Sequence, residues 1–200
     1  MYWEKTSTVI ALKRDDLTGN SLGEVLWVLW AAVLVIATAN AVNLTDGLDG
    51  LASGSAAIGF SAFVIIGYWI FRHPEIYEVS HALDLAIVAA AMTGACIGFL
   101  WWNAAPARIF LGDGGAMLLG LVAATLSIKL RFPDMAPSVS WMVPILVLLV
   151  PIFDTTLVTA SRLRRGLVPF ASPGKDHTAH RLVALGLSHR QAVSVLYICG

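Results

Sequence analysis

The sequence is dominated by apolar runs that are each about as long as a helix that crosses a bilayer. Such a helix needs about 20 mostly apolar residues. Because 58% of the 200 residues are hydrophobic and only 13% are charged, a soluble fold could not bury this much apolar surface. The sequence therefore predicts an all-α, multi-pass transmembrane bundle in one integral-membrane domain. We expect five full spans and the start of a sixth, at about 24–42, 51–71, 83–102, 114–130, 141–160 and 188–200.

Charge and cysteine content exclude several functions. The formal net charge is zero, so no bulk attraction to nucleic acid is expected. The two cysteines form no CxxC pair, which disfavours a zinc or redox site.

Pro144 and Pro151 lie inside the fifth expected span and should kink it.

The loops between spans differ in their polar content. Alternating spans place loops 43–50, 103–113 and 161–189 on one face of the membrane. The sequence SRLRRG follows directly on the fifth expected span, and positive charge beside a span favours the cytoplasmic side. We therefore expect these three loops to face the cytoplasm.

The first of these loops reads NAVNLTDGLDGLASG and carries Asn43, Asp46 and Asp49. Carboxylates at the edge of the hydrocarbon need a cation or water. Its glycines allow close approach of the backbone to a ligand. The structural alternative is that Thr45 or Asp46 merely caps the next helix.

The second loop reads WWNAAPARIFLGDGGAM and carries Asn103, Phe110 and Asp113. Asp113 is a candidate Mg²⁺ ligand, since Mg²⁺ prefers carboxylate oxygen together with water and substrate phosphate. Phe110 could stack on a nucleobase. The alternatives are that Asp113 caps a helix and that Phe110 faces lipid.

The third loop contains KDHTAHR, with Lys175, His177, His180 and Arg181. These side chains could bind phosphate. A zinc site would need a third protein ligand, and an ordinary solvated loop stays open as the alternative. Asp154, at the end of the fifth expected span, is a functional candidate unless Arg162 or Arg164 simply pairs with it.

Together, the loops combine carboxylates for a divalent metal, cations for phosphate and an aromatic side chain on a lipid-facing scaffold. That combination indicates phosphoryl transfer to a substrate dissolved in the membrane.

The three motifs, in this order, resemble those of the polyprenyl-phosphate N-acetylhexosamine-1-phosphate transferases. The third motif extends from PIFDTTLVTASRLRRG through KDHTAHRL. The resemblance implies a Mg²⁺-dependent enzyme, with Mn²⁺ as an alternative metal, in the bacterial cytoplasmic membrane. Such an enzyme moves a sugar-1-phosphate from a UDP-sugar to a polyprenyl phosphate, usually undecaprenyl phosphate, and releases UMP.

The resemblance also implies roles for individual residues. Asp113 would bind Mg²⁺, and Asn103 and Phe110 would line the nucleotide pocket. The residues implied to shape the nucleotide-sugar site or to contact its diphosphate or sugar are Asn43, Asp46, Asp49, His177, His180 and Arg181, with Lys175 as a further phosphate-binding candidate.

Two features depart from the family pattern. An acidic DDxxD-type motif is expected on an earlier loop, whereas residues 1–23 hold only RDDLTGN, so we expect a chain truncated at both ends that could be inactive alone. The peptidoglycan-precursor branch typically carries three consecutive histidines, and this chain has DHTAHR. We therefore expect transfer of N-acetylglucosamine-1-phosphate, with phospho-N-acetylmuramoyl-pentapeptide transfer as the alternative.

Other classes of protein fit less well. A secondary transporter would hold polar residues inside its spans, whereas here they lie at span ends. A CDP-alcohol phosphotransferase would continue the DxxDG motif with further acidic residues, but no acidic residue follows Asp49 until Glu75. A non-catalytic membrane remnant and a homodimer both stay open.

Overall fold

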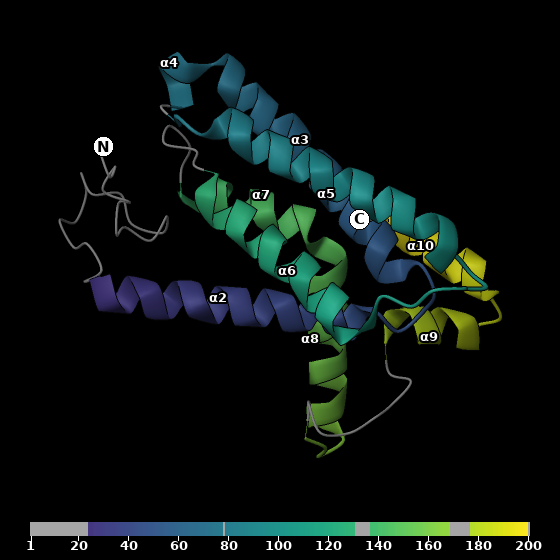
Figure 1. Ribbon diagram of the computed structural model, residues 1–200. Coiled ribbons are helices and arrows are strands. Elements are labelled where there is room, and N and C mark those ends of the chain that lie inside the picture. Colours follow the sequence, from purple (N-terminus) through teal and green to yellow (C-terminus); the bar gives the residue numbers. More distant parts are fainter. Residues whose placement is uncertain (1–23, 78, 131–136, 169–176, 200) are drawn as a thin grey trace.

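The computed structural model describes residues 24–77, 79–130, 137–168 and 177–199. Every regular element in these ranges is a helix, as expected (Figure 1). The helices are α2 (Glu24–Thr45), α3 (Leu51–Arg72), α4 (Pro74–Tyr77), α5 (Ala82–Asn103), α6 (Gly112–Lys129), α7 (Pro137–Val147), α8 (Leu149–Arg164), α9 (Thr178–Ala184) and α10 (His189–Cys199).

Three helical segments in the described residues are long and apolar enough to cross a membrane. They are Val28–Thr45, Leu51–Arg72 and Ala82–Asn103, and they coincide with the first three expected spans. The fourth and fifth expected spans stay predictions. Helix α6 has 18 residues, and the region of the fifth expected span is divided between α7 and α8.

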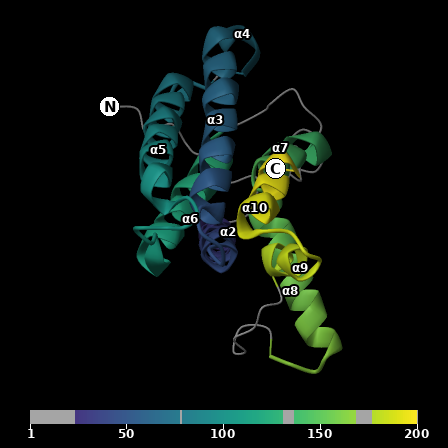
Figure 2. The ribbon, with the colours of Figure 1, turned by 90° about the vertical axis from the view of Figure 1, so that its right-hand side faces the viewer.

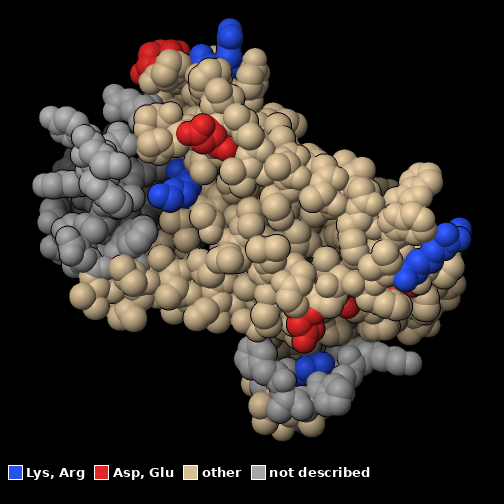
Figure 3. Space-filling model, in the orientation of Figure 1, with Lys and Arg blue, Asp and Glu red and all other residues tan. Residues whose placement is uncertain are grey.

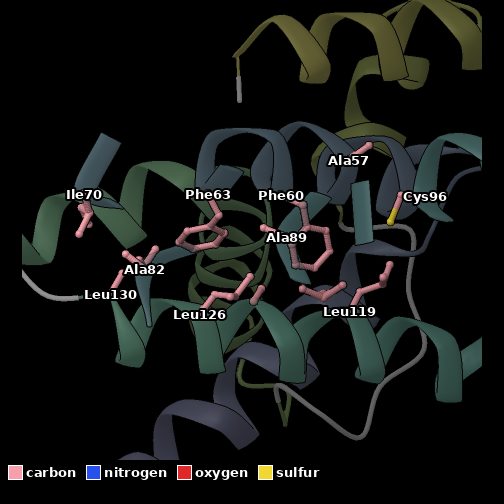
Figure 4. Packing of buried hydrophobic residues seen from close by; sticks show 12 residues of the cluster. Ala57, Phe60, Phe63, Ile70, Ala82, Ala89, Cys96, Leu119, Leu126 and Leu130 are labelled. Atoms are coloured by element: carbon pink, nitrogen blue, oxygen red, sulfur yellow. The ribbon is translucent and has the colours of Figure 1, made fainter. Parts of the chain in front are cut away.

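The main apolar core lies among α3, α5 and α6. Figure 4 shows the rings of Phe60 and Phe63 directed from α3 toward Leu119 and Leu126 of α6. Both phenylalanines are 2% exposed. Because α2, α3 and α5 are apolar around most of their circumference, side chains that leave this core face outward, as lipid contact requires.

Small residues let the helices approach closely. A Cβ on Gly120 of α6 would lie 2.5 Å from the Cα of Ala39 in α2. A Cβ on Gly67 of α3 would lie 3.1 Å from the Cβ of Ala86 in α5. Helix pairs in membranes commonly pack through such small residues, since lipid supplies no hydrophobic drive for helix association.

The proline-containing segment is interrupted, as the sequence predicted. Helix α7 ends at Val147, and α8 begins at Leu149 after a non-helical Leu148. Pro151 has no N–H to donate to the carbonyl of Val147. That carbonyl oxygen instead lies over Gly59 of α3, 3.1 Å from where a Cβ would be. Figure 1 shows that α8 consequently runs steeply across the end of α2.

The last two helices pack on the end of the bundle that carries the three loops. Figure 2 shows α9 and α10 beside α8 and close to the start of α3. A second apolar cluster joins them to the first loop, and its buried members are Leu48, Leu51, Val150, Ala179, Ala192, Val193 and Leu196. On the face shown in Figure 3, the broad middle of the bundle carries few charges, and Asp, Glu, Lys and Arg lie toward its ends.

Candidate functional site

The first loop is a compact turn between α2 and α3. The N–H of Asp46 donates to the carbonyl of Asn43 over 3.2 Å, and Asn43 itself is half-buried in the last turn of α2. Helix α3 is preceded by Gly50, whose φ of 84° favours glycine, and no side chain caps the helix. The simple capping role for Thr45 or Asp46 is therefore not observed.

Asp49 connects the first loop to the second. Its Oδ2 accepts a hydrogen bond of 2.9 Å from the N–H of Ala107, 58 residues later. The two motifs that the resemblance assigns to one site are thus in direct contact. One carboxylate oxygen of Asp49 is committed to holding the second loop.

Asn103 is a structural link rather than an open contact point. Its Oδ1 accepts from the hydroxyl of Ser53 over 2.7 Å, and its Nδ2 donates to the carbonyl of Ile109 over 3.0 Å. The residue is 2% exposed. Asn103 thus ties α3 and α5 to the second loop, and its predicted place in the nucleotide pocket stays a prediction.

Phe110 and Asp113 are both exposed at the end of the second loop. The ring of Phe110 is 73% exposed, so it is available for stacking. Asp113 lies in the first turn of α6, after the N-cap position occupied by Leu111, and the cap makes no side-chain hydrogen bond. Its carboxylate therefore benefits from the helix dipole without being used as a cap.

The negative charges of Asp49 and Asp113 act on the carboxyl group of Asp46. The pKa of Asp46 is raised above its usual value, first by burial and then by the negative charges of Asp113 and Asp49. Mutual repulsion of this kind favours either a proton or a bound cation. The three acidic candidates therefore share one electrostatic environment, although they come from two loops.

The third loop reaches the first through His180. Nε2 of His180 lies 3.8 Å from the position of a Cβ on Gly47. A cleft of about 520 Å³ opens at this point, lined by Gly47, Leu48, Asp49, His180, Val183, Ala184 and His189. His180, which the resemblance assigns to the nucleotide-sugar site, thus lines the same cleft as Asp49, and His189 is a lining residue to which the loop motifs did not point.

His177 is held by Asp154, a partner that the sequence analysis did not assign. Nδ1 of His177 lies 2.7 Å from Oδ2 of Asp154, and the N–H of Thr178 donates to Oδ1 over 2.6 Å. Asp154 therefore pairs with His177, and not with Arg162 or Arg164 as in the alternative to its functional role. The only advance signal was an ionisable residue within an apolar run.

Of the two basic candidates in the third loop, the structure describes Arg181 but not Lys175. Arg181 and Arg165 each donate from Nη2 to the hydroxyl of Ser161 over 2.9 Å, which ties α9 to the end of α8. Lys175 lies outside the described residues, so its predicted role in phosphate binding stays a prediction.

Helix α10 also contributes two contacts that sequence reasoning missed. Nε of Arg190 donates to the carbonyl of Ala105 over 2.8 Å, and the hydroxyl of Tyr197 donates to the carbonyl of Gly50 over 2.5 Å. These bonds connect α10 to the second and first loops. These two hydrogen bonds cannot be predicted from a local sequence pattern, since the bonded residues are 85 and 147 positions apart.

The donor chemistry fits Mg²⁺ without forming a complete cage. Within the described parts of the chain, no three His, Cys, Asp or Glu side chains are grouped so that they could hold a metal by themselves. Mg²⁺ commonly binds through one or two carboxylates together with water and substrate phosphates. Asp113 is exposed, and its negative charge acts on Asp46. These two carboxylates therefore suit a Mg²⁺ ion whose other ligands are water and substrate phosphate.

Comparison with known proteins identifies the family. The model for glycosyl transferase family 4 matches residues 6–131. A phospho-N-acetylmuramoyl-pentapeptide-transferase of Beutenbergia cavernae is 46% identical over 156 residues, which cover 71% of this chain and 43% of that protein. Proteins of the same name from Nocardia farcinica and Mycobacterium bovis are 51% and 52% identical over 123 and 118 residues.

The Nocardia and Mycobacterium alignments cover 58% and 56% of this chain. The chain spans only 33% to 43% of the length of these three relatives. Their name is that of the peptidoglycan branch, which the sequence analysis had ranked second because of DHTAHR. The family match covers the first two motifs, from the Asn43 turn to the start of α6, and extends to residue 131. The chain belongs to glycosyl transferase family 4, as its loop motifs had indicated.

Proposed function

We propose that the complete protein containing this chain transfers phospho-N-acetylmuramoyl-pentapeptide from its UDP nucleotide to a polyprenyl phosphate and releases UMP. The site would face the cytoplasm at the bacterial inner membrane. The names of the relatives support this substrate over N-acetylglucosamine-1-phosphate.

The observation that carries the proposal is the shared environment of Asp46, Asp49 and Asp113. Burial and the two neighbouring carboxylates raise the pKa of Asp46. A bound Mg²⁺ would relieve this repulsion and neutralise charge on a diphosphate. The acidic group therefore has the character of a cation-dependent phosphate site rather than of a set of helix caps.

The surrounding residues suit a nucleotide diphosphate. The exposed ring of Phe110 offers a surface for the uracil. His180, across the cleft from Asp49, can hydrogen-bond to phosphate or sugar oxygens. Asp49 and Asn103 keep the two loops in register through their bonds to Ala107, Ser53 and Ile109.

In the proposed reaction, an oxygen of the lipid phosphate attacks the phosphorus that bears the sugar. The bond to the bridging oxygen breaks, and UMP leaves with that oxygen. This chain's part is to hold the diphosphate in line and to offset its charge, since phosphoryl transfer depends chiefly on positioning and electrostatics.

The decisive experiment is a transfer assay on the complete gene product in membranes. Labelled UDP-N-acetylmuramoyl-pentapeptide and UDP-N-acetylglucosamine are supplied separately with Mg²⁺ and undecaprenyl phosphate. We expect label in the lipid phase with the first donor and its loss on chelation by EDTA. If neither donor delivers label to the lipid phase, the proposal is refuted. If only UDP-N-acetylglucosamine does, the protein transfers N-acetylglucosamine-1-phosphate instead.

Asp113→Asn is the matched test of the metal role. We expect transfer to fall by about two orders of magnitude, the scale typical of losing a group that stabilises developing charge. Asp84→Asn makes the same change at an exposed position in the first turn of α5, the end remote from the loops, and should leave transfer unchanged.

A further inference from the structure

Asp154 is an acidic side chain almost entirely withdrawn from solvent, and both of its oxygens are in use. The residue is 3% exposed and lies in α8. Its Oδ1 accepts from the backbone N–H of Thr178, the first residue of α9, over 2.6 Å. Its Oδ2 lies 2.7 Å from Nδ1 of His177, the residue before α9.

We propose that Asp154 is a positioning residue that keeps the proton of His177 on Nδ1 and so presents Nε2 as the working nitrogen of that ring. The use of Nε2 in transfer rests on the proposed function. The tautomer assignment stands on the geometry of the pair alone.

The proton on Nδ1 follows from the partners. An ionised carboxylate only accepts hydrogen bonds, so the nitrogen that faces Oδ2 must carry a hydrogen. A neutral imidazole has a single N–H, and this contact therefore leaves Nε2 as an acceptor. If the ring is protonated, Nε2 becomes a donor toward a phosphate oxygen.

The backbone of α9 makes a carboxylate necessary at this position. The N–H of Thr178 can only donate, and it occupies Oδ1. An asparagine at position 154 has one oxygen, which that N–H would retain, so its NH₂ group would face Nδ1 of His177. A donor in that place forces the lone pair onto Nδ1 and the proton onto Nε2.

The same reasoning applies to serine proteases, in which replacement of the orienting aspartate by asparagine gives the wrong histidine tautomer. Here the pair is also shielded, since the side chains of His177 and Asp154 are 13% and 5% exposed. Water therefore has little access to replace the carboxylate.

The pair also connects two parts of the site. The rings of His177 and His180 meet edge to face with centroids 6.4 Å apart, and His180 lies over Gly47 of the first loop. Asp154 thus sets the position of the His177 ring from α8, the helix that carries the first part of the third motif.

The test is ¹⁵N NMR of ring-labelled histidine in the complete gene product, with one-bond H–N couplings showing which nitrogens carry hydrogen. This chain contributes five histidines, and His177→Gln identifies the relevant signals by their loss. In the parent protein we expect hydrogen on Nδ1 of His177. In Asp154→Asn we expect hydrogen on Nε2 and none on Nδ1.

Transfer should fall at least about 10-fold in Asp154→Asn, the lower end of the scale found when the hydrogen-bond partner of a metal-bound histidine is removed. Asp154→Glu retains two acceptor oxygens and should keep hydrogen on Nδ1. Asp84→Asn is the matched charge control and should alter neither the spectrum nor transfer.

A parent protein in which Nδ1 of His177 lacks hydrogen overturns the proposal, whatever the variants do. An unchanged tautomer in Asp154→Asn overturns it as well. An inverted tautomer with full transfer removes His177 Nε2 from the reaction. If the parent shows no transfer while its spectrum is as expected, the proposed function fails and the tautomer assignment holds.

Discussion

The hydroxyl of Tyr197 donates a hydrogen bond of 2.5 Å to the carbonyl oxygen of Gly50, 147 residues earlier. Gly50 is the residue from which α3 starts, at the end of the DGLDG turn. This bond and that of Arg190 to Ala105 connect α10 to the first two loops. The acidic turn is therefore held from both sides: Asp49 binds the second loop, and α10 covers the start of α3.

Tyr197→Phe should remove this bond and leave the packing of the ring in place. Because the Gly50 carbonyl then lacks its donor, we expect a loss of about 1 kcal/mol in the free energy of unfolding. The measurement is thermal or denaturant unfolding in detergent. Tyr68→Phe, at a 53% exposed position of α3, should have little effect. Equal effects of the two substitutions would show that the bond to Gly50 contributes nothing.

Gly54→Ala tests the same contact from the opposite side. A Cβ at position 54 would overlap with the hydroxyl and ring of Tyr197. We expect α10 to be displaced, with a loss of about 1 to 3 kcal/mol typical of overpacking. Limited proteolysis after residue 184 should become faster than in the parent. The double variant with Tyr197→Ala should recover part of this loss, since it removes the obstructing ring.

If Gly54→Ala were as stable as the parent and as resistant to proteolysis, the close seating of α10 on α3 would be refuted. Gly98→Ala is a suitable control within a neighbouring helix, because nothing lies within 4 Å of a Cβ there.

Gly120→Ala should weaken the contact between α2 and α6. The added Cβ would come within 2.5 Å of the Cα of Ala39 and 2.8 Å of the carbonyl oxygen of Thr38. Backbone atoms cannot rotate away, so the helices must separate, and we expect a loss of about 1 to 3 kcal/mol. Gly94→Ala, where a Cβ meets no neighbour within 4 Å, should instead be neutral or slightly stabilising. The comparison is made by unfolding in the same detergent.

The extents of the first three spans were predictable because they depend on local composition. Helix α3 begins and ends within a residue of its expected range, and α5 does so too. The interruption near Leu148 was also predictable, since Pro151 cannot supply the missing N–H. Length, apolar content and the position of proline determine these features.

The roles of individual polar residues were harder to predict, because they depend on burial and on distant partners. The bonds of the Asn103 amide to Ser53 and Ile109 were not predicted, and its role in the nucleotide pocket stays a prediction. Asp154 was a functional candidate without an assigned partner, and that partner, His177, lies 23 residues away. Neither contact follows from spacing along one helix; each requires the packing of separate elements.

The subgroup was the other point at which sequence reasoning fell short. The DHTAHR motif favoured the N-acetylglucosamine branch. Similarity to phospho-N-acetylmuramoyl-pentapeptide-transferases over 118 to 156 residues favours the peptidoglycan branch. A single loop motif is a weak guide to the sugar, because positions throughout the fold shape the pocket.

Asp46→Asn should stabilise the fold near neutral pH. Burial, then the charges of Asp113 and Asp49, raise the folded-state pKa of Asp46 above its unfolded value of about 3.9. An acid with a raised folded-state pKa is destabilising once ionised, so the parent loses stability as the pH rises through that pKa. The variant has no such charge, and its advantage should be present at pH 7 and vanish below about pH 4.

The measurement is the unfolding midpoint of both proteins in detergent with EDTA, between about pH 4 and pH 8. Added Mg²⁺ should narrow the difference at pH 7, because a cation relieves the repulsion that Asp46→Asn removes. A variant less stable than the parent at pH 7 would mean that Asp46 is stabilised by a favourable partner, and the argument from carboxylate repulsion would then fail.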